Sequence, residues 1–228
     1  VWHINADEPR VLDYTLAFKT ADPYEPTPYR SSDHDPLVLH LDLTPETTTG
    51  EGGCSREEAP VVINEFRFRG PAGGNDEFIE LFNRSCTPIQ LAGWKVQGLS
   101  TTGSWGDRVT LADITLEPGQ YYLLANGSTG GYSLQVAPDQ TYSTGIADNR
   151  AVRLLDNQGR VVDLVGFASS GQYEGTPLPD GPTSGVTTQI SWKRVPSGKD
   201  TDDNNADFRF GGNWANPQNR ASPPYAEN

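Results

Sequence analysis

Val61-Val-Ile-Asn-Glu-Phe-Arg-Phe68 decides the fold of this chain, because it has the alternation of a half-buried β-strand. The pattern places Val62, Phe66 and Phe68 on one face of that strand, with Asn64 among them. The apolar stretches that follow are equally short, and none sustains the 3.6-residue period of a helix. We expect strands at 61–68, 77–82, 93–97, 108–111, 120–124, 151–155, 160–165 and 188–194.

The hairpin at 151–165 is the clearest local prediction. Asp156-Asn-Gln-Gly159 joins its two apolar runs with residues that tolerate positive φ, as tight hairpin turns require. Many short strands separated by turns, with no helix between them, favour two sheets packed face to face. The fold class indicated by the pattern is therefore all-β, a β-sandwich.

The composition fits a loop-rich protein without a membrane span. Of the 228 residues, 24 are Gly and 18 are Pro, and 35% are hydrophobic. No apolar run approaches the roughly 20 residues that cross a bilayer. The net charge of −13 repels nucleic acid at long range, so the sandwich is not expected to bind it tightly. Such a charge favours solubility, and it does not exclude a metal-assisted phosphodiesterase, whose carboxylates hold cations.

The chain divides into four parts by composition. Residues 1–43 contain short strands around a Pro-rich loop and end in an alternating apolar run at 36–43. Residues 44–57 are expected to be a linker between domains, because 44–53 contain no apolar residue. The predicted sandwich occupies 58–222, and residues 223–228 form a tail.

Cys54 and Cys86 are the two cysteines of the chain. Their spacing matches no zinc pattern, and one pair cannot supply four metal ligands. We expect an extracellular disulfide between them, with two unrelated free thiols as the alternative. A secreted protein would have lost its signal peptide, and none is visible in the sequence.

The sharpest chemical signal lies in residues 1–43. Ser31-Ser-Asp-His-Asp-Pro36 comes directly before a predicted strand, and Arg10-Val-Leu-Asp-Tyr14 is a second apolar segment with an acid near its end. If the two strands pair, Asp13 meets His34 and fixes the tautomer of its imidazole. The other ring nitrogen can then activate a water or stabilise a phosphoryl transition state. Asp33 remains free to hold a divalent cation.

These two motifs resemble the last signature strands of the exonuclease–endonuclease–phosphatase superfamily. The sequence of residues 2–9 is similar to the extracellular nuclease branch of that superfamily. The resemblance implies that residues 1–43 are an N-terminal remnant of an αββα nuclease-type sandwich. It implies that His34 is the catalytic histidine, that Asp13 orients it, and that Asp33 is a metal-site carboxylate for Mg or Ca. These roles apply only in a complete parent domain.

The upstream parts of that superfamily are missing from this chain. Its Gly-Asp-x-Asn motif, its metal-binding Glu and its second catalytic His occur nowhere, and His3 and His40 do not fit them. The chain alone is therefore expected to be inactive, as the C-terminal part of a secreted metal-dependent nuclease whose substrate is nucleic acid. An alternative keeps the superfamily but makes the parent a secreted phosphatase.

The later segment carries a second resemblance, on Val62-Ile-Asn-Glu-Phe66, Asn75-Asp-Glu-Phe-Ile-Glu-Leu-Phe-Asn83 and Ile89-Gln-Leu-Ala-Gly-Trp94. Together these motifs resemble the lamin tail domain, an immunoglobulin-like β-sandwich. The resemblance implies a non-catalytic binding or scaffolding module, with a cell-surface or protein partner. The alternative to a nuclease accessory domain is a free-standing binding module with no nuclease role.

An acidic run near the end of the sandwich offers a second metal site. Asp200, Asp202, Asn204 and Asp207 place oxygen side chains at spacings that can wrap around calcium. The run departs from the EF-hand pattern, because its sixth position is Asn205 and its twelfth is Gly211. A network of turns without a metal is the alternative interpretation.

Three further expectations concern the motif residues of the sandwich. Trp94 should fill the space between the sheets. Asn64 and Asn83 should satisfy backbone groups near strand ends. Glu65 and Glu80 could form a carboxylate pair, but on the strands of an acidic protein we expect a solvated face.

Overall fold

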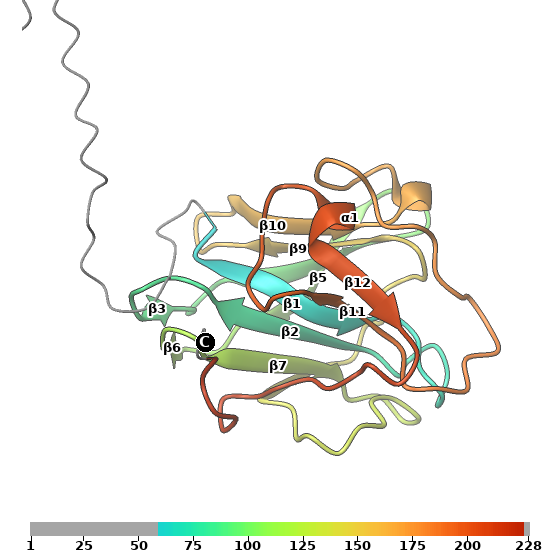
Figure 1. Ribbon diagram of the computed structural model, residues 1–228, viewed down its shortest axis with the longest axis horizontal. Coiled ribbons are helices and arrows are strands. Elements are labelled where there is room, and N and C mark those ends of the chain that lie inside the picture. The colour runs from blue at the N-terminus through green and yellow to red at the C-terminus, as the bar shows by residue number, and fades with distance from the viewer. Residues whose placement is uncertain (1–58, 226–228) are drawn as a thin grey trace, which may run out of the picture. The chain divides into compact units, whose positions relative to one another are not determined.

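Short strands account for nearly all the regular structure of residues 59–225, the part of the chain that the computed structural model describes (Figure 1). The larger sheet has the order β12-β11-β1-β2-β7-β8, and the smaller has the order β10-β9-β4-β5. The strands of the larger sheet are β12 (Phe208–Gly211), β11 (Ser191–Arg194), β1 (Val61–Arg67), β2 (Phe78–Asn83), β7 (Tyr121–Asn126) and β8 (Gln140–Tyr142).

The smaller sheet and a two-stranded ribbon complete the β-structure. The former contains β10 (Val161–Gly166), β9 (Ala151–Leu155), β4 (Lys95–Leu99) and β5 (Trp105–Thr110), and the latter β3 (Ile89–Gln90) and β6 (Thr115–Leu116). Helical structure in the described range is confined to the 3-10 turn Ala168–Ser170 and α1 (Asn204–Asp207), and no helix there is long and apolar enough to cross a membrane. The predicted all-β sandwich is confirmed.

The β9–β10 hairpin forms where the turn chemistry predicts it. The backbone N–H of Gly159 donates to the carbonyl of Asp156 at 3.0 Å, and Gly159 has a φ of 79°. The Asp156 carboxylate accepts from the N–H groups of Gln158 and Arg160, both at 2.9 Å. This side chain therefore supplies the turn with the hydrogen bonds that a strand ladder no longer provides.

A β-bulge in β1 changes which residues of this strand face the core. The pairing with β2 shifts between Ile63 and Glu65, which leaves one extra residue on β1. Ile63 and Phe66 consequently both lie in the main core, whereas Val62 packs on the opposite side with Phe82. The prediction that Val62, Phe66 and Phe68 share one face is wrong, because the bulge interrupts the period of two.

A group of aromatic rings packs within the core between the sheets, among Val, Ile and Leu side chains. Phe66 stacks on Trp192 with the ring centroids 5.7 Å apart, and Phe167 meets the same indole edge-on at 4.9 Å. Trp94 belongs to this cluster and is 7% exposed, as predicted. Phe66 and Trp192 are partners on neighbouring strands of the larger sheet, whereas Phe167 directly follows β10, so its edge-to-face contact helps to fix how the smaller sheet packs on the larger one.

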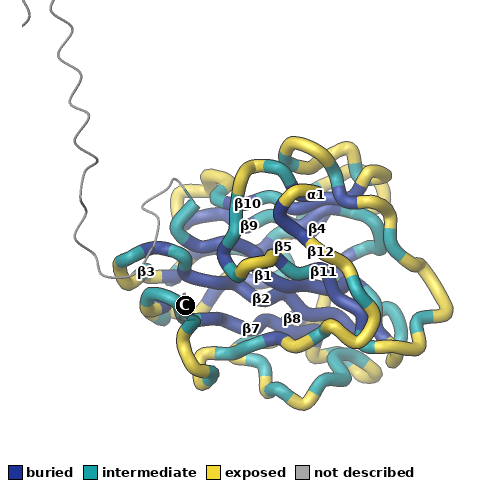
Figure 2. Tube along the Cα trace, in the orientation of Figure 1, coloured by how far each residue is buried: buried dark blue, intermediate teal, exposed yellow. Residues whose placement is uncertain are grey.

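The outer face of the larger sheet is also covered. Every residue of β1, β2 and β7 is buried, so these strands form a dark central band in Figure 2. Two small apolar clusters lie on this outer face, and residues from outside the strands pack against both, Tyr225 and Ala215 among them. Tyr225 packs against Val62, Phe82 and Tyr121, and Ala215 packs against Phe78, Leu123 and Ala125.

Candidate functional site

A buried arginine organises the acidic residues near the end of the sandwich. Arg194 is fully buried at the end of β11, and its guanidinium donates to Asp163 at 2.9 Å, to Asp207 at 3.0 Å and to Asp200 at 3.2 Å. Two backbone carbonyls, those of Ile63 and Lys199, accept its remaining bonds. The carboxylates raise the pKa of Arg194 although burial opposes this. The guanidinium therefore carries a permanent positive charge among these acids.

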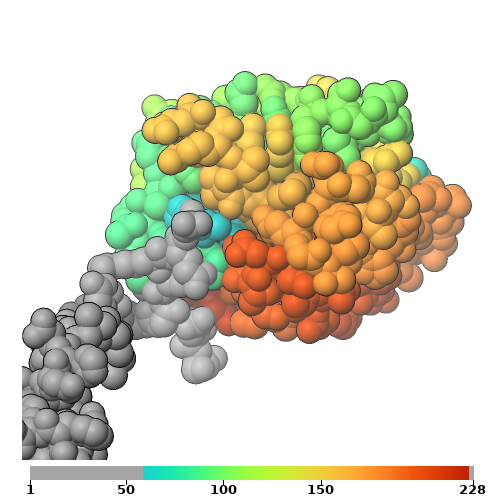
Figure 3. Space-filling model, turned by 90° about the horizontal axis from the view of Figure 1, so that it is seen from above, coloured from blue at the N-terminus to red at the C-terminus, as the bar shows by residue number. Residues whose placement is uncertain are grey.

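Three carboxylates of this region could bind a divalent cation. Single oxygens of Asp163, Glu174 and Asp200 lie within 4.8 Å of one another. Burial raises the pKa of Glu174 to about 8, and the charges of Asp163 and Asp200 add to the effect. The segments that carry them, in orange and red, lie side by side on the face in Figure 3. The cluster is acidic enough to attract a cation, but Arg194 already neutralises part of its charge.

The four residues predicted as calcium ligands are not gathered around one point. Asp200 and Asp207 meet at the Arg194 guanidinium, as described above. The Asn204 amide instead bonds to β10, accepting from the Gly166 N–H and donating to the Leu164 carbonyl, both at 2.9 Å. Asp202 is exposed and sits in a turn with a φ of 54°.

This arrangement favours a network of turns and ion pairs, and calcium binding stays a prediction. Of the four predicted ligands, Asp200 alone joins the carboxylate cluster. Asp163 and Glu174 were missed, because they lie on other elements and no local spacing connects them to the acidic run.

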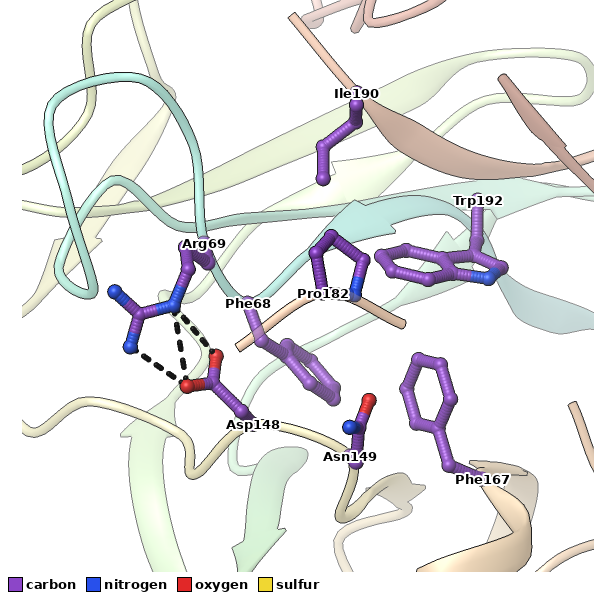
Figure 4. Close-up of a pocket in the computed structure, with 8 residues that line it drawn as sticks. All are labelled: Phe68, Arg69, Asp148, Asn149, Phe167, Pro182, Ile190 and Trp192. Atoms are coloured by element: carbon purple, nitrogen blue, oxygen red, sulfur yellow. Dashed lines mark hydrogen bonds and ion pairs between the residues drawn. The ribbon is translucent and has the colours of Figure 1, made fainter. Parts of the chain in front are cut away.

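A small aromatic hollow opens beside the end of β1 (Figure 4). Phe68, Phe167 and Trp192 form its floor, and Pro182 and Ile190 form part of its wall. At its rim Arg69 bonds to both carboxylate oxygens of Asp148, at 2.6–3.2 Å. The hollow is shallow and far smaller than ordinary small-molecule sites, so it has no room for a cofactor.

Asn149 fixes the loop that borders this hollow. Its side-chain amide donates to the Gly181 carbonyl at 3.0 Å, and its oxygen accepts from the Gly181 N–H at 2.8 Å. Asn149 adopts a φ of 53°, which Asn tolerates better than most residues. Asn149 thus attaches the loop at Gly181 to the sandwich, in addition to the backbone bonds that Leu178 makes with Gly166 and Ala168.

The carboxylate pair at Glu65 and Glu80 is buried, so the expectation of a solvated face is wrong. The two residues are cross-strand partners in β1 and β2, and both are fully buried on the outer side of the larger sheet. Burial raises the pKa of Glu80 to about 8, with the nearby Glu65 as the next cause. Lys193 approaches Glu65 at 3.1 Å and compensates one negative charge.

The two motif asparagines satisfy polar groups inside the protein. Asn83 is buried and donates to the carbonyls of Thr87 and Leu116 at 2.9 and 2.8 Å, while its oxygen accepts from the Ser85 N–H. Asn64 accepts from the Gly198 N–H at 2.8 Å and donates to Glu80. Both therefore bond to backbone groups, as predicted.

Hydrogen bonds also hold a buried glutamate directly before β2. Glu77 accepts from the Ile146 N–H at 2.9 Å and from the amide of Asn126 at 3.0 Å. Burial raises its pKa to about 7 in spite of these bonds. Asn126 is 1% exposed, so this part of the sandwich is closed to solvent.

Several predicted residues lie outside the range that the structure describes. They are Asp13, Asp33, His34 and Cys54, together with the whole of the predicted linker 44–57. Cys86 is among the described residues, but its expected partner is not, so the disulfide stays a prediction.

Residues 55–169 match the model of a family described as Lamin Tail Domain, which is half of the chain. No curated protein matches the chain significantly. The matched segment begins before β1 and ends in the 3-10 turn, so β11, α1 and β12 complete the sandwich beyond it.

Proposed function

The chain belongs to the lamin tail domain family, and from this premise we propose that its sandwich is a non-catalytic binding or scaffolding module of a secreted metal-dependent nuclease. One observation carries the non-catalytic part. The described carboxyl groups whose pKa values burial raises, those of Glu77, Glu80, Asp163 and Glu174, all accept hydrogen bonds from backbone N–H groups of the sandwich. They are therefore committed to holding the fold, whereas a catalytic acid must reach a substrate.

The nuclease part rests on residues 10–14 and 31–36. In a complete parent domain, Asp33 would hold Mg or Ca, and the metal would stabilise the charge that develops on the phosphate. His34 would supply or remove a proton, with its ring oriented by Asp13. The substrate in this proposal is nucleic acid, and a phosphomonoester is the alternative.

Nuclease assays of the chain and of its parent gene test the proposal. With added magnesium, the present chain should cleave duplex DNA no faster than its His34→Ala variant. The gene region upstream of Val1 should encode a Gly-Asp-x-Asn motif, and its full product should hydrolyse DNA faster than phosphomonoesters. A preference for phosphomonoesters would identify a phosphatase, and an upstream region without the motif would contradict the nuclease origin.

A free-standing binding role is the second candidate, favoured by two exposed rings near β12. Phe210 is 45% exposed and Trp214 is 48% exposed, which is typical of residues that contact a partner. Binding to isolated cell envelopes that Phe210→Ala and Trp214→Ala both abolish would support a cell-surface or protein partner. Unchanged binding in both variants would exclude this surface.

The charge of the chain makes DNA a poor ligand for the sandwich itself. At low salt, the net charge of −13 should prevent a gel shift with duplex DNA. A clear shift would contradict this prediction and would make the module a substrate-recruiting domain.

A further inference from the structure

The end of the described chain crosses the outer face of the larger sheet. We call residues 212–225 the strap. Near its start, the Ala215 N–H donates to the Gln189 carbonyl at 3.0 Å, and at its end the Tyr225 N–H donates to the Gly119 carbonyl at 2.9 Å. The apolar clusters around Ala215 and Tyr225 lie at the same two places.

Two buried carboxyl groups hold the middle of the strap. The Asn216 N–H donates to Oε1 of Glu65 at 3.0 Å, and the Gln218 N–H donates to Oε2 of Glu80. Because Glu65 and Glu80 are directly opposite each other on β1 and β2, alternate backbone N–H groups of the strap reach a matching pair of acceptors. These bonds are made by the backbone, so the strap's own side chains do not decide them.

One positive charge, that of Lys193, is available to compensate the Glu65–Glu80 pair. Lys193 from β11 approaches Glu65, while Arg67 is occupied by Asp76 in a buried ion pair. The phenols of Tyr121 and Tyr132 also face this region, and burial raises both pKa values, so they stay neutral. Asp139 bonds to the strap further along, at the Arg220 N–H. Two ionised glutamates, both 0% exposed, would thus share one ammonium in a buried site.

We propose that the strap is a proton-dependent cover, which stays closed while one proton is bound by the Glu65–Glu80 pair and loosens when that proton is lost. The pair is dry only while the strap covers it. Opening hydrates both carboxylates and removes the cost of placing two negative charges side by side, so loss of the proton favours the open form.

The direction of the pH effect follows from the two states. In the closed form the pKa of Glu80 is about 8, and in an open, hydrated form it should return toward its ordinary value of 4.5. The closed form therefore binds the proton more tightly than the open form. The resulting stabilisation of the closed strap is complete below about pH 4.5 and is lost as the pH rises through 8. Between pH 6 and pH 8 the ratio of closed to open strap should fall about 50-fold.

Hydrogen exchange of the strap measures this ratio. In the wild-type chain, exchange of peptide 212–225 between pH 6 and pH 8, corrected for its intrinsic pH dependence, should accelerate about 50-fold relative to peptide 151–166 of the smaller sheet. In Glu80→Gln, which keeps the shape and an oxygen for the Gln218 N–H but loses the acceptor for Asn64, the acceleration should disappear. Glu117→Gln, at an exposed glutamate, is the matched control and should behave as wild type.

Glu65→Gln keeps the test decisive if Glu80→Gln does not fold. This variant removes the like charge and leaves Glu80 buried, so the acceleration should fall to about 10-fold or less. Equal acceleration in wild type and in either pair variant would overturn the proposal, as would a wild-type strap whose corrected exchange does not change with pH.

Discussion

Arg194 and Asp163 form an ion pair that connects the two sheets of the sandwich. Arg194 ends β11 of the larger sheet, Asp163 lies in β10 of the smaller one, and their side chains are 0% and 1% exposed. The second oxygen of Asp163 accepts from the Ile63 N–H in β1. One carboxylate therefore joins three strands from two sheets, in a place where water cannot replace it.

Removal of this carboxylate should destabilise the sandwich strongly. Asp163→Ala leaves Arg194 buried next to fewer acids and leaves the Ile63 N–H without an acceptor. We expect a loss of about 3–5 kcal/mol in the free energy of unfolding, measured by urea denaturation. Asp107→Ala breaks an exposed ion pair with Lys95 and should cost about 1 kcal/mol or less. Similar losses in both variants would contradict the structural role of the buried pair.

Calcium should stabilise the sandwich little, because Arg194 occupies the space between the acidic side chains. A site with a Kd of about 10 µM would add about 2.7 kcal/mol at 1 mM calcium. We expect a gain of less than about 0.5 kcal/mol at this concentration, which is a shift in Tm near the error of the measurement. A rise of several degrees that Asp200→Asn abolishes would establish the calcium site.

The expected disulfide can be tested by mass. Without reductant, the denatured chain should take up no alkylating reagent at Cys54 or Cys86, and with reductant it should take up two equivalents. Reduction should also lower the free energy of unfolding by about 3–4 kcal/mol on the chain-entropy argument. Two alkylated cysteines in the unreduced chain would rule the disulfide out.

The loop at 171–190 should depend on Asn149. Asn149→Ala removes both bonds to Gly181 and places alanine at positive φ, so we expect a loss of about 2–3 kcal/mol and faster chymotryptic cleavage at Tyr173. Asn149→Gly removes the same bonds, but glycine adopts the positive φ without strain. The loss in its free energy of unfolding should therefore be about 1 kcal/mol smaller than in Asn149→Ala. If the two variants are equally stable, the backbone conformation at this position is not strained.

The strand pattern predicted the sandwich and the β9–β10 hairpin, because both depend on local features. Alternation and turn residues act over a few positions, and the Asp156–Gly159 turn contains its own hydrogen bonds. The bulge in β1 could not be predicted in this way. Asn64 is the extra residue of the bulge, and its side chain bonds to Glu80 and to the N–H of Gly198. Gly198 is 134 positions away in the sequence, so no local pattern contains this contact.

The same limit explains what the sequence pattern missed at the two sites. Glu65 and Glu80 look solvated in an acidic sequence, but the strap that covers them comes from the other end of the domain. The acidic run at 200–207 has spacing that suits calcium, and calcium binding stays a prediction, but Asp200 and Asp207 bond to Arg194, whose role no local spacing reveals. Long-range contacts decided both cases, and single-sequence patterns do not contain them.

The burial of Asn83 and Asn126 has a practical consequence for producing this protein. Each begins an Asn-x-Ser triplet, the acceptor pattern for N-linked glycans, at positions 83–85 and 126–128. With 0% and 1% of their surfaces exposed, neither side chain can carry a sugar in the folded sandwich. A eukaryotic secretory host that modifies the nascent chain would attach a bulky group where the fold needs an amide, so a bacterial host is the better choice for structural work.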